Sequence, residues 1–242
     1  PRKGSRSNLW FPPDTAHSED DEFDGSSLDA SWYAYNHITA AYESFVTGLD
    51  TYDGSYTGDD IRYSLSRRSW VLLQANSAYI GKTVTLATNV LVMARLKFSQ
   101  PYSGMTFQDR NIGLRLMGDS GGKPSSSDSA SMYLQQGTGS GLVYARFYLN
   151  NGGSQVLDNN TTDVDQQGQA LEYVAIHKIG TTYHGWVGTA AGNWIYMGEA
   201  YGYFVSMAPV GIFVGNNTTT LPGLGVFGVD FIRFLETDNF LF

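Results

Sequence analysis

Short apolar runs that alternate with polar positions recur along most of the chain. In residues 90–96, the odd-numbered positions carry Leu, Met and Arg, and the even-numbered positions carry Val, Val, Ala and Leu. This pattern is typical of a strand that is largely buried on both faces. Comparable runs predict strands at 71–73, 84–86, 112–117, 132–134, 142–149, 170–178, 183–188, 210–214 and 226–234.

The segments between these runs complete the pattern. Asn150–Gly153 and Ile179–Thr181 have the Asn and Gly content of hairpin turns, and the Gly/Ser/Asp-rich segment Gly118–Asp128 is expected to be an exposed loop. The only helical candidate is the short segment Ala40–Phe45. Strands that follow one another at roughly 8 to 12 residues predict an all-β sandwich or barrel.

The first twenty residues have neither a strand nor a helix period. They contain three basic residues and then the sequence Trp10, Phe11, Pro12, Pro13. Because proline cannot donate to a strand ladder, we expect an extended N-terminal arm at 1–20 and a single sandwich domain at 21–242. The aromatic residues of the arm either pack on the chain's own sandwich or, as we predict, dock onto a neighbouring subunit.

Composition narrows the class of protein. Charged residues make up 16% of the chain, where about 25% is usual, and the formal net charge is −8. An acidic body argues against nucleic acid as a partner, and no apolar stretch is long enough to predict a transmembrane helix. No apolar segment follows the basic N-terminus, so we expect a protein made in the cytoplasm, with a secreted domain as the alternative.

Three segments, taken in order, resemble the concanavalin A-like lectin/glucanase superfamily. They are Asp21–Trp32, the hairpin series from Leu171 to Gly198, and the pair Pro209–Phe213 and Val226–Arg233. The hairpin series is similar to laminin-G-like accessory domains of bacterial glycosidases. The resemblance implies a single concanavalin A-like (jelly-roll) β-sandwich of two antiparallel sheets. It also implies that Trp194 fills the core between them.

A second resemblance concerns only the segment Trp10–Asp24. It looks like the start of some tailed-bacteriophage structural proteins that carry this sandwich. It implies a virion protein made in the host cytoplasm, such as a head decoration, neck, tail or fibre component. The expected partners are other virion proteins, copies of the chain itself as a homotrimer, and cell-surface glycan. The alternative is a carbohydrate-binding accessory module or a glycoside hydrolase on the same fold.

The resemblance implies a known arrangement of catalytic carboxylates. Retaining glucanases of the superfamily carry Glu-x-Asp-x-x-Glu on one strand, so that the side chains share a face. The only dense acidic cluster, 19–24, lacks the apolar interleaving of such a strand, and we therefore predict that the chain is not an enzyme. Glu172 and Glu199 are the carboxylates to test if activity appears.

Two kinds of binding site remain as expectations. No cofactor is required, but the resemblance implies a structural Ca²⁺ site between the first and last strands, with ligands from Asp21, Glu22, Asp24 and Asp230; the alternative is a solvated acidic patch. His177 and His184 are expected to face each other across a hairpin without a third metal ligand. Aromatic platforms for sugars are expected at Tyr133, Tyr144, Tyr148, Trp186 and Tyr196, with sheet packing as the alternative.

Overall fold

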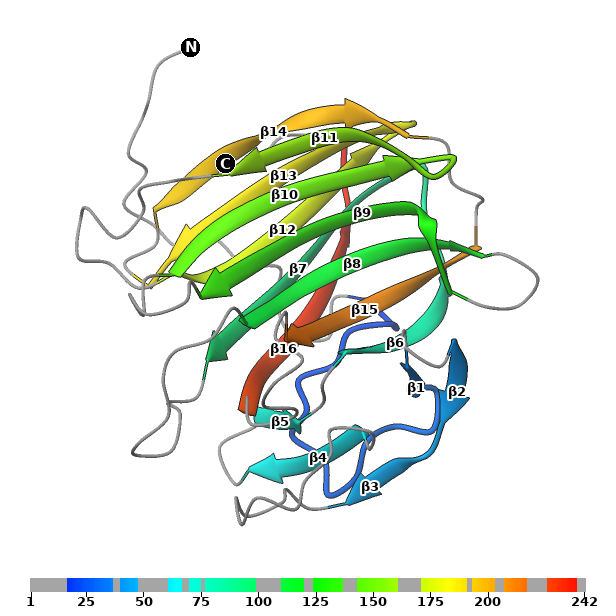
Figure 1. The fold of residues 1–242 in the computed structure, drawn as a ribbon, viewed down its shortest axis with the longest axis vertical. Helices are drawn as coiled ribbons and strands as arrows, with labels where there is room; N and C mark the ends of the chain where they lie inside the picture. Colours follow the sequence, from blue (N-terminus) through cyan, green and yellow to red (C-terminus); the bar gives the residue numbers. More distant parts are fainter. Residues whose placement is uncertain are drawn as a thin grey trace.

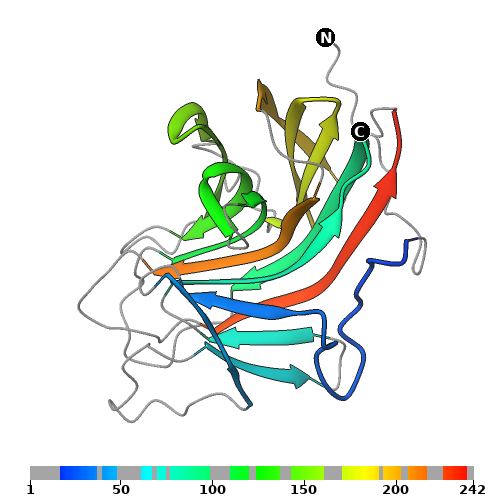
Figure 2. The same cartoon turned by 90° about the vertical axis from the view of Figure 1, so that its right-hand side faces the viewer.

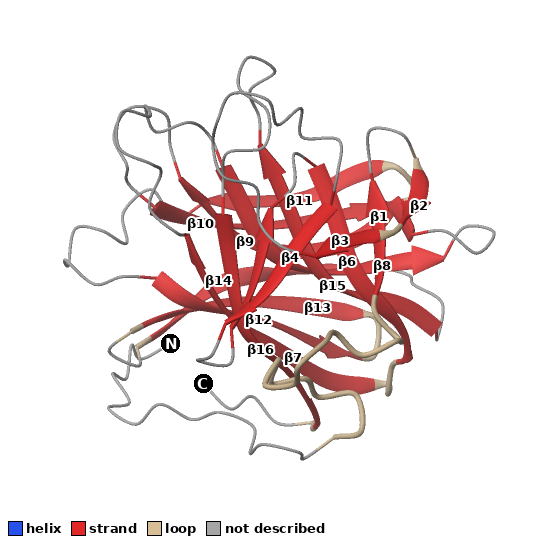
Figure 3. Cartoon of the chain, turned by 90° about the horizontal axis from the view of Figure 1, so that it is seen from below, coloured by secondary structure: helices blue, strands red, loops and turns tan. Residues whose placement is uncertain are grey.

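The computed structural model describes residues 17–36, 40–47, 61–66, 70–74, 77–98, 110–119, 124–136, 143–160, 171–190, 193–202, 207–216 and 226–238. These residues form sixteen strands and no helix, as the pattern of the sequence predicts (Figures 1 and 3). Within the described ranges, no helical segment has the length and hydrophobicity of a transmembrane span. The prediction of an all-β sandwich is confirmed.

The strands form two eight-stranded sheets. The first sheet has the order β11 (Ser154–Asn160), β10 (Val143–Asn151), β9 (Pro124–Gln136), β8 (Arg110–Asp119), β15 (Met207–Asn216), β6 (Ser77–Thr85), β1 (Tyr33–Asn36), β2 (Ala41–Glu43). The second sheet has the order β14 (Trp194–Tyr201), β13 (Thr182–Thr189), β12 (Leu171–Ile179), β7 (Asn89–Phe98), β16 (Val226–Glu236), β5 (Trp70–Gln74), β4 (Ile61–Ser66), β3 (Phe45–Thr47). Neighbouring strands are antiparallel except for the parallel pair β3 and β4.

The main core lies between the two sheets. Val92, Ala94 and Leu96 of β7 pack there with alternate residues of the opposite sheet, such as Leu114 of β8 and Met132 of β9. Four of the strands predicted from the sequence, β7, β12, β15 and β16, lie near the centre of the two sheets. Since alternate residues point to opposite faces, each sheet also presents an outer face, away from the main core.

The two edges of the sandwich are joined in different ways. At one edge, only Ser44 separates β2 of the first sheet from β3 of the second, so the chain itself crosses between the sheets. At the other edge, β11 lies beside β14, and the Asn159 side-chain amide donates to the Met197 carbonyl at 2.9 Å (Figure 1). These contacts hold the sheets in a fixed relation to each other.

The end of the predicted arm and the residues after it pack along β16 (Figure 2). Asp21 exchanges two backbone hydrogen bonds with Ile232, and the Asp20 carboxylate accepts the backbone N–H of Phe234. Phe23 and Trp32 then enter the main core. The segment resembling a first strand thus forms a single bridge rather than a long strand. Residues 1–16, with Trp10, Phe11, Pro12 and Pro13, lie outside the described residues.

Two local predictions are wrong. Ala40–Phe45, the helical candidate, contributes to β2 and β3, because β2 finds a pairing partner in β1 and Ala40 has a φ of 52°. Gly118–Asp128 is not simply a loop, because β8 extends to Asp119 and β9 begins at Pro124, with a register shift after Met117. The predicted hairpin turns are confirmed at Gly152, Gly153 and Gly180, which have positive φ.

Candidate functional site

The outer face of the first sheet carries polar and aromatic side chains where its inner face carries aliphatic ones. On β8, the core residues Ile112 and Leu114 alternate with Asn111 and Arg115, which face outward. Strand pairing aligns these outward positions with those of the neighbouring strands. We call the resulting surface the polar–aromatic face; it comprises Asn111, Gly113 and Arg115 of β8, Ser131, Tyr133 and Gln135 of β9, Tyr144, Arg146 and Tyr148 of β10, and Gly211 and Phe213 of β15.

A row of these residues continues across the whole sheet. Tyr133 lies opposite Arg146 on one side and Gly113 on the other, and Phe213 follows on β15. The row ends in a tyrosine cluster made by Tyr33, Tyr35, Tyr42 and Tyr79. Tyr42 is 48% exposed, so the aromatic row reaches solvent at this end.

Glycine makes this arrangement sterically possible. A Cβ on Gly113 would lie 2.2 Å from the Cβ of Tyr133, far inside the contact distance of two carbon atoms. A Cβ on Gly81 would lie 2.4 Å from the ring of Tyr79. The two tyrosines therefore occupy space that any other residue at these glycine positions would fill.

Arg115 belongs to the row of the polar–aromatic face that also contains Ser131, Tyr148 and Gly211. Its guanidinium carbon is 4.0 Å from the centroid of the Phe213 ring, and its Nε donates to the Ser131 hydroxyl at 2.7 Å. Burial lowers the pKa of Arg115 to about 10, so it stays protonated at neutral pH. The residue as a whole remains partly exposed.

Arg146 has a carboxylate partner, in contrast to Arg115. It binds Asp158 of β11 through both Nε and Nη2, with the Nε to Oδ1 distance at 2.5 Å. This hydrogen bonding raises the pKa of Arg146 and lowers the pKa of Asp158. The guanidinium carbon also lies 5.9 Å from the centroid of Tyr133 and 5.7 Å from that of Tyr148. The ion pair therefore holds two of the predicted sugar-binding tyrosines in place.

Asn111 supplies an unsatisfied acceptor at the same face. It is only 8% exposed, and its Oδ1 has no hydrogen-bond partner among the described residues. Gln135, directly opposite on β9, is buried as well. Buried side-chain oxygens are nearly always hydrogen-bonded, so the Asn111 oxygen is an exception on this face.

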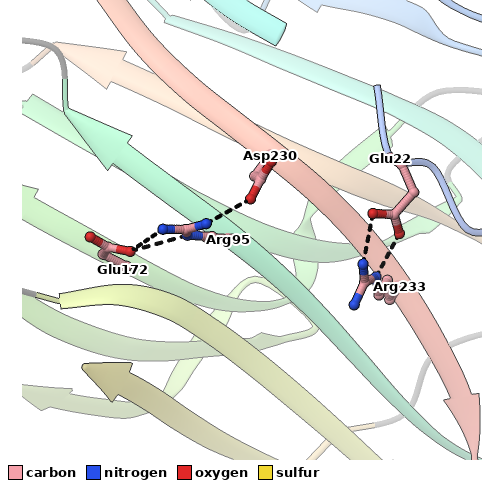
Figure 4. Close-up of polar contacts among 5 residues, drawn as sticks. All are labelled: Glu22, Arg95, Glu172, Asp230 and Arg233. Atoms are coloured by element: carbon pink, nitrogen blue, oxygen red, sulfur yellow. Dashed lines mark hydrogen bonds and ion pairs between the residues drawn. The ribbon is translucent and has the colours of Figure 1, made fainter. Parts of the chain in front are cut away.

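The outer face of the second sheet is held together by ion pairs (Figure 4). Arg95 of β7 lies between Glu172 of β12, at 2.8 Å, and Asp230 of β16, at 3.0 Å. Glu22 binds Arg233 through both carboxylate oxygens, at 2.5 and 2.7 Å. These contacts tie the N-terminal segment to β16 and join the three strands β7, β12 and β16.

These ion pairs occupy residues that were expected to bind Ca²⁺. Asp230 and Glu22 each bind an arginine, while Asp21 accepts hydrogen bonds from the Phe23 backbone and the Trp32 indole. Asp24 is exposed. In the described parts of the chain, no group of three or more His, Asp or Glu side chains is placed to hold a metal ion. The calcium site stays a prediction, and ligation by Asp230 would require release of Arg95.

A second polar group lies nearer the edge of this outer face. The Tyr196 hydroxyl donates to Glu199 at 2.9 Å, and Nδ1 of His184 lies 3.1 Å from the same carboxylate. His177 and His184 lie opposite each other on β12 and β13, as expected. Burial lowers the pKa of both histidines. Glu172 and Glu199, the carboxylates singled out for testing, thus belong to separate networks.

The predicted sugar-binding residues divide between opposite sides of the molecule. Tyr133, Tyr144 and Tyr148 lie on the polar–aromatic face, whereas Trp186 and Tyr196 pack together on the outer face of the second sheet, at 4.6 Å between ring centroids. One binding site cannot contain all five. Arg115 and Asn111 were not among the site residues predicted from the sequence, although the alternation in 111–115 places both on the face opposite Ile112 and Leu114.

The expected position of Trp194 is also wrong. It packs with Tyr173 and Phe231 in a cluster on the outer face of the second sheet, rather than between the sheets. Its ring lies over Gly188, where an added Cβ would approach the indole to 3.1 Å. The missing side chain at Gly188 leaves the room that Trp194 fills.

No protein-family model matches the sequence, and no curated protein matches it. Solved structures do match the fold. The chain is similar over 96% of its length to 41% of a Bacteroides ovatus protein described as xyloglucan PUL GH43B, with 14% identity and a TM-score of 0.55. A prokaryotic β-1,3-1,4-glucanase (lichenase) from a mouse hindgut metagenome matches over 90% of this chain and 98% of its own, with 9% identity and a TM-score of 0.55.

A lectin-like domain belongs to the same set. The VIP36 exoplasmic/lumenal domain, in its Ca²⁺/Man3GlcNAc-bound form, matches over 76% of this chain and 84% of its own, with 10% identity and a TM-score of 0.50. The chain therefore has the concanavalin A-like β-sandwich fold that the resemblance implies. It spans about two fifths of the length of the GH43 proteins it matches.

These comparisons correct one functional expectation. The prediction that the chain is not an enzyme is overturned, because glycoside hydrolases are among the proteins that share its fold, beside lectins. The missing Glu-x-Asp-x-x-Glu arrangement excludes only one catalytic design. None of these comparisons bears on a role in a bacteriophage virion, which stays a prediction.

Proposed function

We propose that the chain binds carbohydrate on the polar–aromatic face of the first sheet. The observation that carries the proposal is the co-location of tyrosine and phenylalanine rings with Arg115, Arg146 and an unsatisfied Asn111 oxygen. Aromatic rings stack on the C–H faces of sugars, while amide and guanidinium groups bind their hydroxyls. The glycoside hydrolases and lectins that share the fold support the same class of ligand.

Tyr133 is the residue whose removal tests this proposal. It lies between Arg146 and Gly113 in the middle of the face and is partly exposed. Replacing Tyr133 by Ala removes the ring but leaves the strand, and it should weaken binding of the best glycan on an array by tenfold or more. Isothermal titration calorimetry would measure the dissociation constant.

The matched control is Tyr196→Ala on the opposite side of the molecule. Tyr196 is 45% exposed on the outer face of the second sheet, so its replacement removes a comparable ring without touching the polar–aromatic face. Binding should be unchanged in this variant. Loss of binding in Tyr196→Ala with full binding in Tyr133→Ala would move the site to the second sheet and refute the assignment.

A finer proposal is that this glycan-binding protein belongs to a bacteriophage particle. Its support is the resemblance of Trp10–Asp24 to tailed-phage proteins. A particle would use many copies of such a face, because repetition strengthens weak individual contacts with a cell-surface glycan. Co-sedimentation of the chain with purified particles tests this role, and its absence from them would contradict it.

A further inference from the structure

We propose that the glycan bound on the polar–aromatic face is acidic, and that Arg115 binds its carboxylate. The proposal rests on the proposed function and adds the chemical class of the ligand. It is drawn from the surroundings of one cation, from the charge balance of the face, and from the unsatisfied oxygen of Asn111.

Arg115 has hydrogen-bond donors to spare. A guanidinium carries five N–H donors, and among the described residues Arg115 uses only Nε, on the Ser131 hydroxyl. Phe213 covers one side of the planar group at 4.0 Å. A partly buried cation of this kind is costly without an anion, and its fork geometry suits a carboxylate held by two parallel hydrogen bonds.

The other arginines show what is missing at Arg115. Arg95, Arg146 and Arg233, whose side chains the structure also describes, each bind at least one carboxylate. In the described residues around Arg115, the neighbours are Ser131, Phe213 and tyrosines. Arg115 is therefore the exception, and a ligand carboxylate would give it the partner that the others have within the chain.

The charge of the face supports an anionic ligand. Among its described residues and their partners, Arg115 and Arg146 contribute two positive charges and Asp158 one negative charge. The whole chain, by contrast, has a formal net charge of −8. A locally positive site on an acidic protein selects an anion at that point while repelling anions elsewhere.

Asn111 indicates that the ligand also carries hydroxyl groups. Its buried Oδ1 needs a donor, which a carboxylate lacks and a sugar hydroxyl supplies. Asn111 and Arg115 lie four residues apart on the same face of β8, a distance of about 13 Å along the strand. Between them is Gly113, over which the Tyr133 side chain packs, so a ligand that reaches both residues crosses Tyr133. This span is longer than one sugar ring, so the ligand is an oligosaccharide that contains a carboxylated sugar such as a uronic acid.

The test compares acidic oligosaccharides with their own neutral derivatives. Tri- to hexasaccharides from polygalacturonate, alginate and hyaluronan are each measured beside the carboxyl-reduced form, which keeps the sugar stereochemistry. The wild-type chain should bind at least one acidic form tenfold or more tighter than its reduced counterpart. Arg115→Gln should lower that preference to less than threefold.

Arg95→Gln is the matched control, since it removes the same charge from the opposite side of the sandwich. It should keep the preference for the acidic form. If Arg115→Gln does not fold by circular dichroism, Arg115→Lys keeps the charge but not the fork, and it should lose most of the preference. Equal binding of reduced and acidic forms, or a preference that survives these Arg115 variants, would overturn the inference.

The outcomes separate the two proposals. Binding of neutral glycans that depends on Tyr133, with no preference for acidic ones, would overturn the acidic ligand and leave the carbohydrate-binding face intact. Binding of no glycan, acidic or neutral, would refute both.

Discussion

Replacing Gly113 by Ala would show whether the polar–aromatic face depends on the close contact of β8 with Tyr133. The added Cβ would lie 2.2 Å from the Cβ of Tyr133 and 2.7 Å from the carbonyl oxygen of Met132. Both contacts involve atoms at or next to the backbone, which cannot rotate away. The strands β8 and β9 must therefore separate locally, and Tyr133 must shift.

The magnitude follows from two opposing effects. Overpacking of this kind costs about 1–3 kcal/mol of stability. The cost of Gly113→Ala should lie near the upper end of this range, because the clashing atoms belong to the backbone or are bonded to it. The lower chain entropy of the unfolded alanine variant offsets about 0.4–1 kcal/mol. A net loss of about 2 kcal/mol, with a urea m-value of about 2–3 kcal/mol/M, lowers the unfolding midpoint by about 0.7–1 M.

Urea unfolding and glycan titration of the same variant check this reasoning. Gly180→Ala is the control, because Gly180 has a φ of +58° and no atom within 4 Å of an added Cβ. Its cost, about 1 kcal/mol, comes from the left-handed backbone alone, and it lies in the β12–β13 turn. Gly113→Ala should lose both stability and binding, and Gly180→Ala only stability. An unchanged midpoint in Gly113→Ala would refute the steric argument.

Three further predictions concern the rest of the molecule. Burial depresses the pKa of His177 and His184 below the unfolded value of about 6.5, so protonation favours the unfolded chain and stability should fall as pH drops from 7 to 5. The melting temperature should fall less steeply between pH 7 and pH 5 when both histidines are replaced by Gln. Glu22→Gln removes the carboxylate that binds Arg233, whose side chain is 11% exposed, and should cost about 1–3 kcal/mol in urea unfolding; an unchanged midpoint would mean that the pair is neutral. Deletion of residues 1–16 should preserve the melting temperature but reduce self-association in analytical ultracentrifugation, whereas unfolding of the truncated chain would show that the arm packs on its own sandwich.

The sequence alone determined where most strands lie and that the fold is all-β, while the choice of a sandwich over a barrel came from the family resemblance. Alternation of polar and apolar residues is a local property, and it identifies β7, β12, β15 and β16 without knowledge of their partners. Glycine in the hairpin turns is equally local, because the left-handed φ there is a property of one residue. The segments at 40–45 and 118–128 were misjudged because pairing with neighbouring strands outweighs their weak intrinsic preference.

Only the tertiary structure decided which side chains meet. Alternation along β8 places the side chains of Arg115 and Leu114 on opposite faces of the sheet. It does not reveal that β15, which lies almost one hundred residues further along the chain, brings Phe213 onto the Arg115 guanidinium. Likewise, five aromatic candidates look equivalent in sequence, yet strand order sends Tyr133 to one side of the sandwich and Trp186 to the other. The difference arises because side-chain direction is set by the strand's own period, whereas the sheet and the neighbours are set by long-range pairing and burial.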